Sequence, residues 1–360
     1  MTNQVDILIF VEDPGATNMA LDLPAKLVDR GYQATLLAAN HAIDYLSVRH
    51  LTFQAVTNDV DAGFLLDHFM PKLLSVGTSE NPDSIGLALI DEARMRNIPV
   101  VAMVDMACNA ERRFRGRGDI ALTHAPDRLI VSDAITQDAF VALGFPLEHI
   151  ALLGHPQYDM AWRRRRELEQ AGLRAPRVSP RWVFVAEGFD QLNPAASYRT
   201  PEYTLMGRGD TDWRTGIVLE EILDGIAALQ PRPDIVVRLH PKSMRQDFNQ
   251  WVNDISFDDG TDPLACIWDA DVVLGMSSML LVEAAILGRP VLSILPRQSE
   301  SQWLGPLAMK YVASVWDRKS LRSTLGHLHR GAAPGVPAAE WAAPNAGDNI
   351  ADYLALTART

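Results

Sequence analysis

The sequence predicts an α/β fold of two doubly wound, Rossmann-like domains that face each other across a cleft. The chain has 360 residues, about twice the usual size of one domain. Short apolar runs alternate with helical patterns along both halves, as they do in the βαβ units of a parallel sheet. Between the halves, residues 162–181 hold four consecutive arginines and two prolines, which predicts a linker.

In the first half, the predicted strands are continuous apolar runs, which is typical of parallel strands covered by helices on both faces. The predicted strands are residues 5–11, 33–38, 73–76, 99–104, 128–131 and 150–153, and the predicted helices are 18–30, 84–96 and 134–143. Glycines at 31 and 144 end two of these helices. The pattern predicts an N-terminal domain over residues 1–161.

A second alternating set follows the linker. Its predicted strands are 182–186, 235–239, 272–274 and 291–295, and its predicted helices are 212–229 and 279–287. This set predicts a C-terminal domain over residues 182–345. The tail at 349–356 has helical spacing, and we expect a final helix within residues 346–360.

Composition and charge exclude several classes of protein. The formal net charge is −12, so the overall field disfavours nucleic acid and anionic membrane surfaces. Two distant cysteines predict neither a disulfide framework nor a cysteine zinc site. The N-terminus lacks a secretory signal, and no apolar stretch approaches the roughly 18–20 residues needed to span a bilayer. We expect a soluble, cytoplasmic protein, and its oligomeric state stays open.

The strongest local signal follows the strand at 272–274. Gly275 allows close approach, and Ser277 and Ser278 stand where a helix begins, an arrangement that favours a phosphate. The alternative is that one serine only caps the helix. Glu283, about one and a half turns further on, is a candidate for binding ribose hydroxyls or a plain surface glutamate.

A second signal ends the strand at 235–239. Arg238, His240 and Lys242 place three potential cations there, and Pro241 fixes the backbone. Cations beside a phosphate site neutralise a diphosphate or hold a nucleotide. The alternative for His240 is a structural role.

The first strand ends in an acidic loop. Glu12 and Asp13 are adjacent, and Gly15 and Asn18 follow within the same loop. The loop is neither the dinucleotide fingerprint nor a P-loop, so no nicotinamide cofactor, and no other cofactor, is expected. One acid is a candidate general base, whereas Asp13 is equally suited to cap the next helix. Two adjacent acids are costly to bury unless one is used or protonated.

Other polar residues end strands of the first domain. They are Ser79, Glu80, Asp105 and His155. Because ligands of open parallel sheets bind at the carboxyl ends of the strands, we count these residues as acceptor-side candidates. A hinge role for His155 is equally plausible.

Metal and hydrolase motifs are weak. Asp269 and Asp271 form a D-x-D pair, but the pair precedes a strand instead of following one. No H-E-x-x-H or G-x-S-x-G segment occurs. We therefore expect no metal site and no serine hydrolase.

The combination of motifs resembles the GT-B glycosyltransferase superfamily. An R-x-H-P turn precedes a G-x-S-S segment, which is followed by E-A-A and G-R-P. These segments stand at Arg238–Pro241, Gly275–Ser278, Glu283–Ala285 and Gly288–Pro290. The second half of the chain is also similar to the C-terminal half of UDP-N-acetylglucosamine 2-epimerases. The resemblance implies a GT-B-like fold, serines 277 and 278 at the phosphates, and the glutamate at 283 on the ribose.

A narrower likeness is to bacterial sialyltransferases and related CMP-sugar transferases. They pair an acidic motif before glycine with H-P and S-S motifs. His240-Pro241 and Ser277-Ser278 match in order, whereas the acidic motif is half present, with Glu187 as its only acid. The same H-P and S-S pair is found in CDP-glycerol phosphotransferases.

The sequence therefore predicts a metal-independent glycosyltransferase. It would move a sugar from a CMP-, CDP- or UDP-linked donor to an acceptor in surface polysaccharide or glycoconjugate synthesis. Asp13 is the first choice of base and Glu187 the second, and His240 would stabilise the leaving phosphate. The alternatives are a UDP-N-acetylglucosamine 2-epimerase-like enzyme and a non-catalytic nucleotide-sugar-binding protein.

Overall fold

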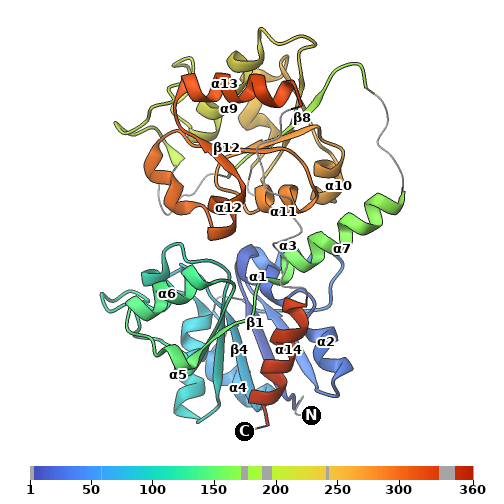
Figure 1. Cartoon of the computed structure of the whole chain (residues 1–360). Coiled ribbons are helices and arrows are strands. Elements are labelled where there is room, and N and C mark those ends of the chain that lie inside the picture. The colour runs from blue at the N-terminus through green and yellow to red at the C-terminus, as the bar shows by residue number, and fades with distance from the viewer. Residues whose placement is uncertain are drawn as a thin grey trace. The chain divides into compact units, whose positions relative to one another are not determined.

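The computed structural model describes residues 4–57, 59–171, 177–188, 197–240, 243–331 and 345–359. The chain divides into two compact units, each built on one parallel sheet (Figure 1). Unit 1 is Met1–Asp159 with Ala343–Thr360, and unit 2 is Met160–Ala342. The prediction of two doubly wound, Rossmann-like α/β domains is confirmed.

Unit 1 contains a seven-stranded sheet in the order β3-β2-β1-β4-β5-β6-β7, with every neighbouring pair parallel. Its strands are β1 (Ile7–Val11), β2 (Ala34–Ala38), β3 (Gln54–Ala55), β4 (Leu73–Gly77), β5 (Val100–Val104), β6 (Arg128–Val131) and β7 (Ile150–Leu152). All residues of β1, β4 and β5 are buried, which explains their continuous apolar sequences. The strand order reverses between β1 and β4, and this reversal marks the expected ligand position of a doubly wound sheet.

Helices cover both faces of this sheet. They are α1 (Pro14–Ala20), α2 (Leu23–Asp29), α3 (His41–Ser47), α4 (Ala62–Phe69), α5 (Ile85–Met95), α6 (Ala134–Ala142) and α14 (Ala346–Thr357), with short 3-10 turns η1 (Ala110–Arg112) and η2 (Leu147–His149). The single helix predicted over residues 18–30 is wrong. The chain forms α1 and α2 instead, because Pro24 stands in the first turn of α2 and has no N–H to continue an earlier helix.

The last helix belongs to unit 1. In Figure 1, α14 lies beside α2. Lys26 forms an ion pair with Asp348 at 2.7 Å, and the Tyr32 hydroxyl donates to the Ala355 carbonyl at 2.9 Å. Together with the buried Leu354, these contacts attach the C-terminal segment to the first sheet.

The arginine run lies on α7 (Pro156–Ala171). Arg164 pairs with Asp262 at 2.9 Å, and Arg165 donates to the Ile286 carbonyl at 2.9 Å. The first part of the stretch predicted as a linker is therefore helical, and residues 172–176 lie outside the described residues.

Unit 2 repeats the strand order of unit 1. Its six parallel strands follow the order β10-β9-β8-β11-β12-β13. They are β8 (Arg181–Val185), β9 (Asp234–Arg238), β10 (Ile255–Phe257), β11 (Val272–Gly275), β12 (Val291–Ile294) and β13 (Ala313–Val315). The reversal here falls between β8 and β11, so the carboxyl ends of these two strands mark the second expected ligand position.

The helices of unit 2 form two layers around this sheet. They are α9 (Arg214–Ile226), α10 (Pro263–Trp268), α11 (Leu280–Ile286), α12 (Pro306–Tyr311) and α13 (Arg318–His329), with 3-10 segments η3 (Arg245–Trp251) and η4 (Gln298–Trp303). Figure 1 shows α9 and α13 on one face and α10, α11 and α12 on the other.

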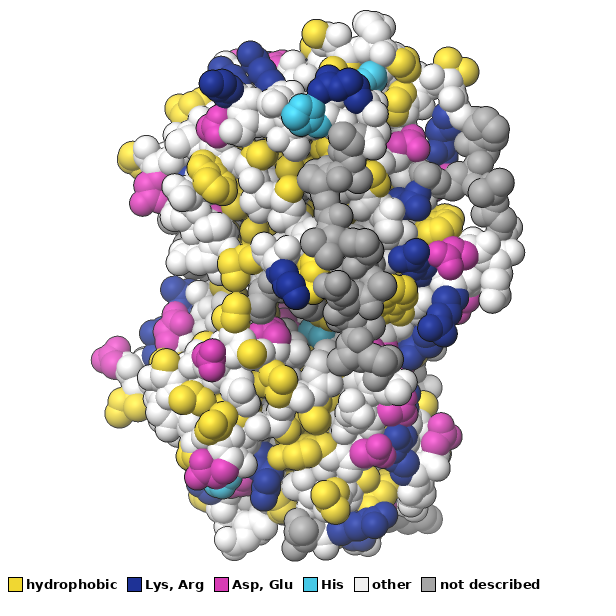
Figure 2. All heavy atoms as spheres, in the orientation of Figure 1, with side chains coloured by type: hydrophobic (Ala, Val, Ile, Leu, Met, Phe, Trp, Pro, Cys, Tyr) yellow, Lys and Arg dark blue, Asp and Glu magenta, His cyan; other side chains and the backbone are white. Residues whose placement is uncertain are grey.

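The surface of both units is mixed in charge. On the face drawn in Figure 2, basic and acidic side chains are interspersed and form no continuous basic surface. This agrees with the net charge of −12. No helix among the described parts of the chain is long and apolar enough to cross a membrane.

Removing a buried side chain from α5 tests the packing of unit 1. Leu89 is fully buried, whereas Met95 on the same helix is 68% exposed. We expect Leu89→Ala to lower the free energy of unfolding by about 2–5 kcal/mol, because a cavity replaces apolar contacts. Met95→Ala, the matched control, should change it by less than about 0.5 kcal/mol. Urea denaturation measures both, and equal effects would contradict this packing.

Candidate functional site

Three predicted site residues, Glu187, Ser277 and His240, meet at the strand reversal of unit 2. Glu187 follows β8 and Ser277 follows β11, the neighbouring strand. The Glu187 carboxylate accepts hydrogen bonds from the Ser277 backbone N–H and from the Ser277 hydroxyl, the latter at 3.0 Å. A Cβ atom at Gly188 would lie 2.5 Å from Nδ1 of His240. Glycine at 188 therefore lets the histidine at the end of β9 pack against the same segment.

A buried arginine holds this arrangement in place. Arg214, the first residue of α9, donates to Glu187 at 2.5 Å and, from Nε, to Glu300 at 2.8 Å. Glu300 also accepts from Nε of Arg297 at 3.1 Å. Glu300 is completely buried, and Arg214 is 5% exposed. Two carboxylates and two guanidinium groups thus balance each other inside unit 2, as buried charges require.

The two carboxyl groups of this network respond differently to burial. Burial raises the pKa of Glu187, but the charge of Arg214 and hydrogen bonds from Arg214 and Ser277 outweigh it and hold the pKa below its usual range. At Glu300, burial prevails over both arginines and raises the pKa. Glu187 is thus a stably ionised acceptor, which suits a positioning role better than that of a base poised near neutral pH.

The remaining donor-side candidates of unit 2 have varied surroundings. Arg238 forms an ion pair with Asp258 at 2.5 Å. Ser278 accepts the Leu280 N–H at 3.2 Å and so caps the start of α11. Its hydroxyl hydrogen is the part of this side chain that can donate to a ligand.

Four further donor-side candidates complete the set. Gly275 is the last residue of β11, where a Cβ atom would lie 2.9 Å from the Leu281 side chain. Glu283 is 5% exposed within α11. Pro241 and Lys242 lie outside the described residues.

Unit 1 has a similar contact at its own strand reversal. Ser79, after β4, donates its hydroxyl to Asp13, after β1, at 2.6 Å. Glu12 beside it is 1% exposed, and neither of its carboxyl oxygens makes a hydrogen bond. Burial and the charge of Asp13 raise the pKa of Glu12, and nearby polar groups such as Ser79 offset the rise only in part. Burial thus makes Glu12 a weaker acid than an exposed glutamate.

A second carboxylate lies at the end of the next strand. Asp105, after β5, is 7% exposed and pairs with Arg113 at 3.5 Å. Arg113 also lies 3.8 Å from Glu80, which follows β4. Gly15 lies in the first turn of α1 and not in a loop as predicted. A Cβ atom there would overlap the Asp105 carboxylate, so glycine is needed for the start of α1 to lie against it.

His155 lies after β7, at the start of α7. It is 3% exposed, and its Nδ1 accepts the Gln157 N–H at 3.2 Å. Its buried Nε2 has no hydrogen-bond partner. Burial lowers the pKa of His155 to about 4, against the opposing carboxylates of Asp105 and Asp133.

Asn18 has a structural contact. Its amide oxygen accepts the Tyr45 hydroxyl at 2.7 Å, which joins α1 to α3. Its predicted acceptor-side role stays a prediction.

The two carboxylates of the D-x-D pair are engaged by neighbouring arginine residues of unit 2. Asp269 forms an ion pair with Arg177, and Asp271 accepts the Arg181 N–H at 2.8 Å. Within the described ranges, no group of three or more histidine, cysteine, aspartate or glutamate side chains is arranged to hold a metal ion.

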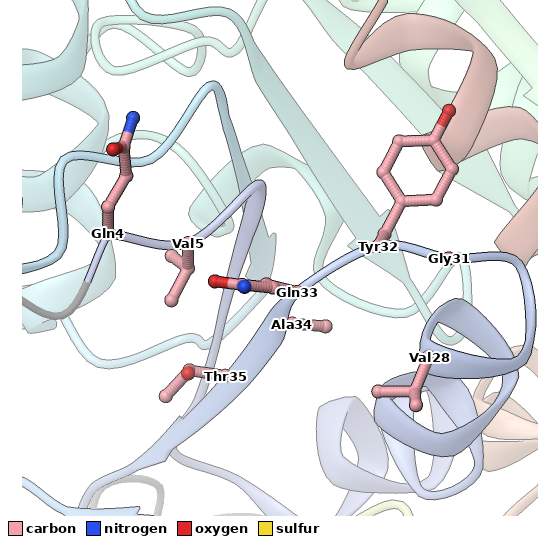
Figure 3. A pocket seen from close by; sticks show the side chains of 8 residues that line it. All are labelled: Gln4, Val5, Val28, Gly31, Tyr32, Gln33, Ala34 and Thr35. Carbon is pink, nitrogen blue, oxygen red and sulfur yellow. The ribbon is translucent and has the colours of Figure 1, made fainter.

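A pocket in unit 1 lies near the amino ends of β1 and β2, away from these residues (Figure 3). It is lined by Gln4, Val5, Val28, Gly31, Tyr32, Gln33, Ala34 and Thr35. No carboxylate, histidine or cation is among them, and the Tyr32 hydroxyl already donates to Ala355. The chemistry-bearing groups lie instead at the carboxyl ends of the strands.

Solved structures resemble the whole chain. The UDP-GlcNAc 2-epimerase from Methanocaldococcus jannaschii is 12% identical, with 98% of this chain and 99% of that chain covered and a TM-score of 0.67. The enzyme from Neisseria meningitidis, bound to UDP-GlcNAc, is 14% identical, with 98% and 100% covered and a TM-score of 0.66. The chain has their fold.

A further solved structure also matches over its whole length. HepE from Anabaena, in complex with UDP, is 13% identical, with 98% and 97% covered and a TM-score of 0.54. No protein-family model and no curated protein matches the sequence. The motif resemblance to 2-epimerases and GT-B proteins is thus confirmed at the level of the fold.

Sequence reasoning missed the charged partners of these sites. Arg214 and Glu300 stand 86 positions apart, and Arg113 lies in the charged segment at 109–115, for which a solvated loop is the default prediction. Nothing in a helical or loop pattern distinguishes a buried arginine from an exposed one.

Removing Arg214 tests the buried network. Arg214→Met leaves the buried Glu187 without its cation and Glu300 with Arg297 alone, so we expect a loss of about 3–5 kcal/mol in the free energy of unfolding. Arg232→Met, which breaks an exposed pair with Asp254, should cost no more than about 1 kcal/mol. Because the pKa of Glu187 is lowered on folding, its contribution is present above pH 4.5 and is lost as the pH falls through its folded pKa. Denaturation series at several pH values measure all three effects.

Glu12 should show the opposite pH dependence. Its pKa is raised on folding from 4.5, so the wild type loses stability as the pH rises from 4.5 to the folded pKa. Glu12→Gln removes this loss and should be more stable relative to wild type at pH 7 than at pH 4. Glu80→Gln, at a partly exposed acid, is the control. A difference between Glu12→Gln and wild type that does not change with pH would show that Glu12 ionises freely.

Proposed function

We propose that this protein is an enzyme that acts on a nucleotide-activated sugar, and that it transfers the sugar to an acceptor hydroxyl. The observation that supports this most is the repetition of one site design. Both units reverse their strand order beside a carboxylate and a serine, Asp13 with Ser79 and Glu187 with Ser277. In doubly wound sheets such positions bind ligands.

The donor nucleotide is assigned to unit 2. Ser277 and Ser278 would meet its phosphates, and His240 would stabilise the negative charge of the leaving group. Because Glu187 already accepts from both donors of Ser277, Ser278 would supply the more available hydroxyl. A UDP donor is favoured over CMP or CDP because similar structures were solved with UDP or UDP-GlcNAc.

The acceptor is assigned to unit 1, with Asp13 as general base. One oxygen of Asp13 accepts from Ser79, which leaves the other to take the proton of an acceptor hydroxyl. We propose that the reaction needs no metal ion and no cofactor, since the D-x-D carboxylates are held by Arg177 and Arg181. Glu187, as an ion-paired carboxylate, would position Ser277.

A 2-epimerase reaction is the second candidate. It is favoured by the similarity to two UDP-GlcNAc 2-epimerases over the whole chain. Such a reaction moves a proton at carbon 2 of the sugar, which needs an acid and a base. Glu12, whose pKa is raised by burial, and Asp13 would supply them.

Nucleotide titration tests the donor assignment. The double variant Ser277→Ala, Ser278→Ala should bind UDP about 5–100-fold more weakly, because hydrogen bonds to a charged phosphate are lost. Ser299→Ala, at an exposed serine of the same unit, is the control. Calorimetry with UDP, CDP and CMP measures the affinities and identifies the base. Unchanged UDP affinity in the double variant would reduce both serines to a structural role.

Turnover tests the catalytic roles. Asp13→Asn should lower kcat by about 10²–10⁴-fold and leave the UDP affinity nearly unchanged, because only the base is removed. His240→Ala should weaken both turnover and UDP binding. Incubation with UDP-GlcNAc alone, followed by NMR, separates the two reactions, since only an epimerase converts it without an acceptor.

Three outcomes would contradict these roles. Full turnover in Asp13→Asn together with none in Glu187→Gln would move the base to Glu187. Loss of activity in EDTA that Mg²⁺ or Mn²⁺ restores would overturn the metal-free reaction. If neither acid mattered for any sugar nucleotide, a binding protein would be favoured over an enzyme.

A further inference from the structure

His155 has a defined proton position. Backbone N–H groups only donate, so Nδ1, which receives the Gln157 N–H at 3.2 Å, must carry a lone pair. A neutral imidazole then holds its single proton on Nε2. Burial keeps the ring neutral, with a pKa of about 4. His155 is therefore a hydrogen-bond donor at Nε2 throughout the neutral pH range.

This donor is buried without a partner. Nε2 is inaccessible and makes no hydrogen bond, and the whole residue is 3% exposed. Leaving a buried N–H unpaired costs free energy, so such groups in native proteins call for an explanation. At the same edge of the sheet, both oxygens of Glu12 also lack hydrogen bonds, and Oδ1 of Asp105 has only the ion pair with Arg113 at 3.5 Å. An edge that leaves a donor and acceptors without hydrogen bonds suits a ligand whose groups both donate and accept.

The charged groups around His155 favour a neutral ligand over an anionic one. Asp105, after β5, and Asp133, at the start of α6, both act electrostatically on the imidazole. From α7, the neutral Tyr158 ring packs against it at 5.1 Å. Arg113 is engaged by Asp105 and Glu80. An anionic oxygen here would face Asp105, Asp133 and Glu80 with the single cation Arg113 among them, whereas a hydroxyl oxygen can accept from Nε2 and donate to a carboxylate.

We propose that His155 determines sugar specificity, with its Nε2–H donating to a hydroxyl or ether oxygen of an uncharged sugar held beside Asp105. This deepens the proposed function and rests on it. It disfavours sugars or acceptors that present a carboxylate or phosphate at this position, such as a sialic acid. The site of unit 1 thus binds uncharged sugars through their hydroxyl groups.

A purely structural alternative is that His155 only caps α7. It precedes Pro156, and its Nδ1 accepts the N–H of the second helical residue, as a capping side chain does. Two variants separate the roles. His155→Asn keeps an acceptor that caps the helix but lacks the distal donor. His155→Gln supplies an N–H near the position of Nε2.

The experiment combines NMR with calorimetry on the full chain. In wild type, the ¹⁵N signals of His155 should report the Nε2–H tautomer from pH 5.5 to 8. Methyl glucoside and N-acetylglucosamine should shift the Nε2–H signal, and glucuronate, the acidic counterpart, should not. His155→Asn should fold as wild type and bind UDP within 2-fold, yet bind methyl glucoside about 3–10-fold more weakly, as expected for one lost hydrogen bond. His155→Gln should recover part of this loss.

Each contrary result has a distinct meaning. An Nδ1–H tautomer, a glucuronate response equal to that of methyl glucoside, or wild-type methyl glucoside affinity in His155→Asn would overturn the role of His155 and leave the proposed function intact. If wild type binds neither UDP nor UDP-GlcNAc, the proposed function fails instead. In that case the free-sugar titration alone tests the role of His155, and an Nε2–H signal that does not change on adding sugar would overturn that role.

Discussion

The reversal of strand order is the constraint on which both sites depend. Next to the first strand of each sheet, the chain turns from one direction of winding to the other, and the two flanking loops diverge. Backbone pairing ends there, so side chains must close the gap. A carboxylate from one loop and a serine from the other do so in both units, Asp13 with Ser79 and Glu187 with Ser277.

The two closures differ in how their charge is balanced. In unit 2, Arg214 lies between Glu187 and Glu300, and together with Arg297 it balances the charge of these two carboxylates in a hydrogen-bonded network. In unit 1, no cation forms an ion pair with buried Glu12 among the described residues, and burial raises the pKa of its carboxyl. The same topology thus gives an ionised carboxylate, Glu187, at the edge of unit 2 and a buried acid with a raised pKa, Glu12, at the edge of unit 1.

The sequence predicts the strands well and the electrostatics poorly. A fully buried parallel strand is a continuous apolar run, which can be recognised in the sequence. Once the strands are located, the residues directly after β1, β4, β8 and β11 can be named as the carboxyl ends of the strands. Weak elements were missed, including β3 and β13, because two or three residues carry no periodicity. Arg214 was missed because its partners are distant in sequence. Glu187 acts as an ionised, positioning carboxylate because of this arginine. Its role could therefore not be predicted from the sequence.

The difference between the two edges suits them to different steps of a reaction. Proton transfer needs a group that changes its protonation near neutral pH, and binding a phosphate needs donors that do not. Ser277, held by an ionised Glu187, belongs to the second kind, whereas Glu12, whose pKa is raised by burial, is the candidate for the first. Transfer and epimerisation both divide their work in this way, since each holds a nucleotide while a proton moves at the sugar or acceptor. The neutral, donating His155 fits the same division, because it offers a hydrogen bond to a sugar oxygen without taking part in the proton exchange beside it.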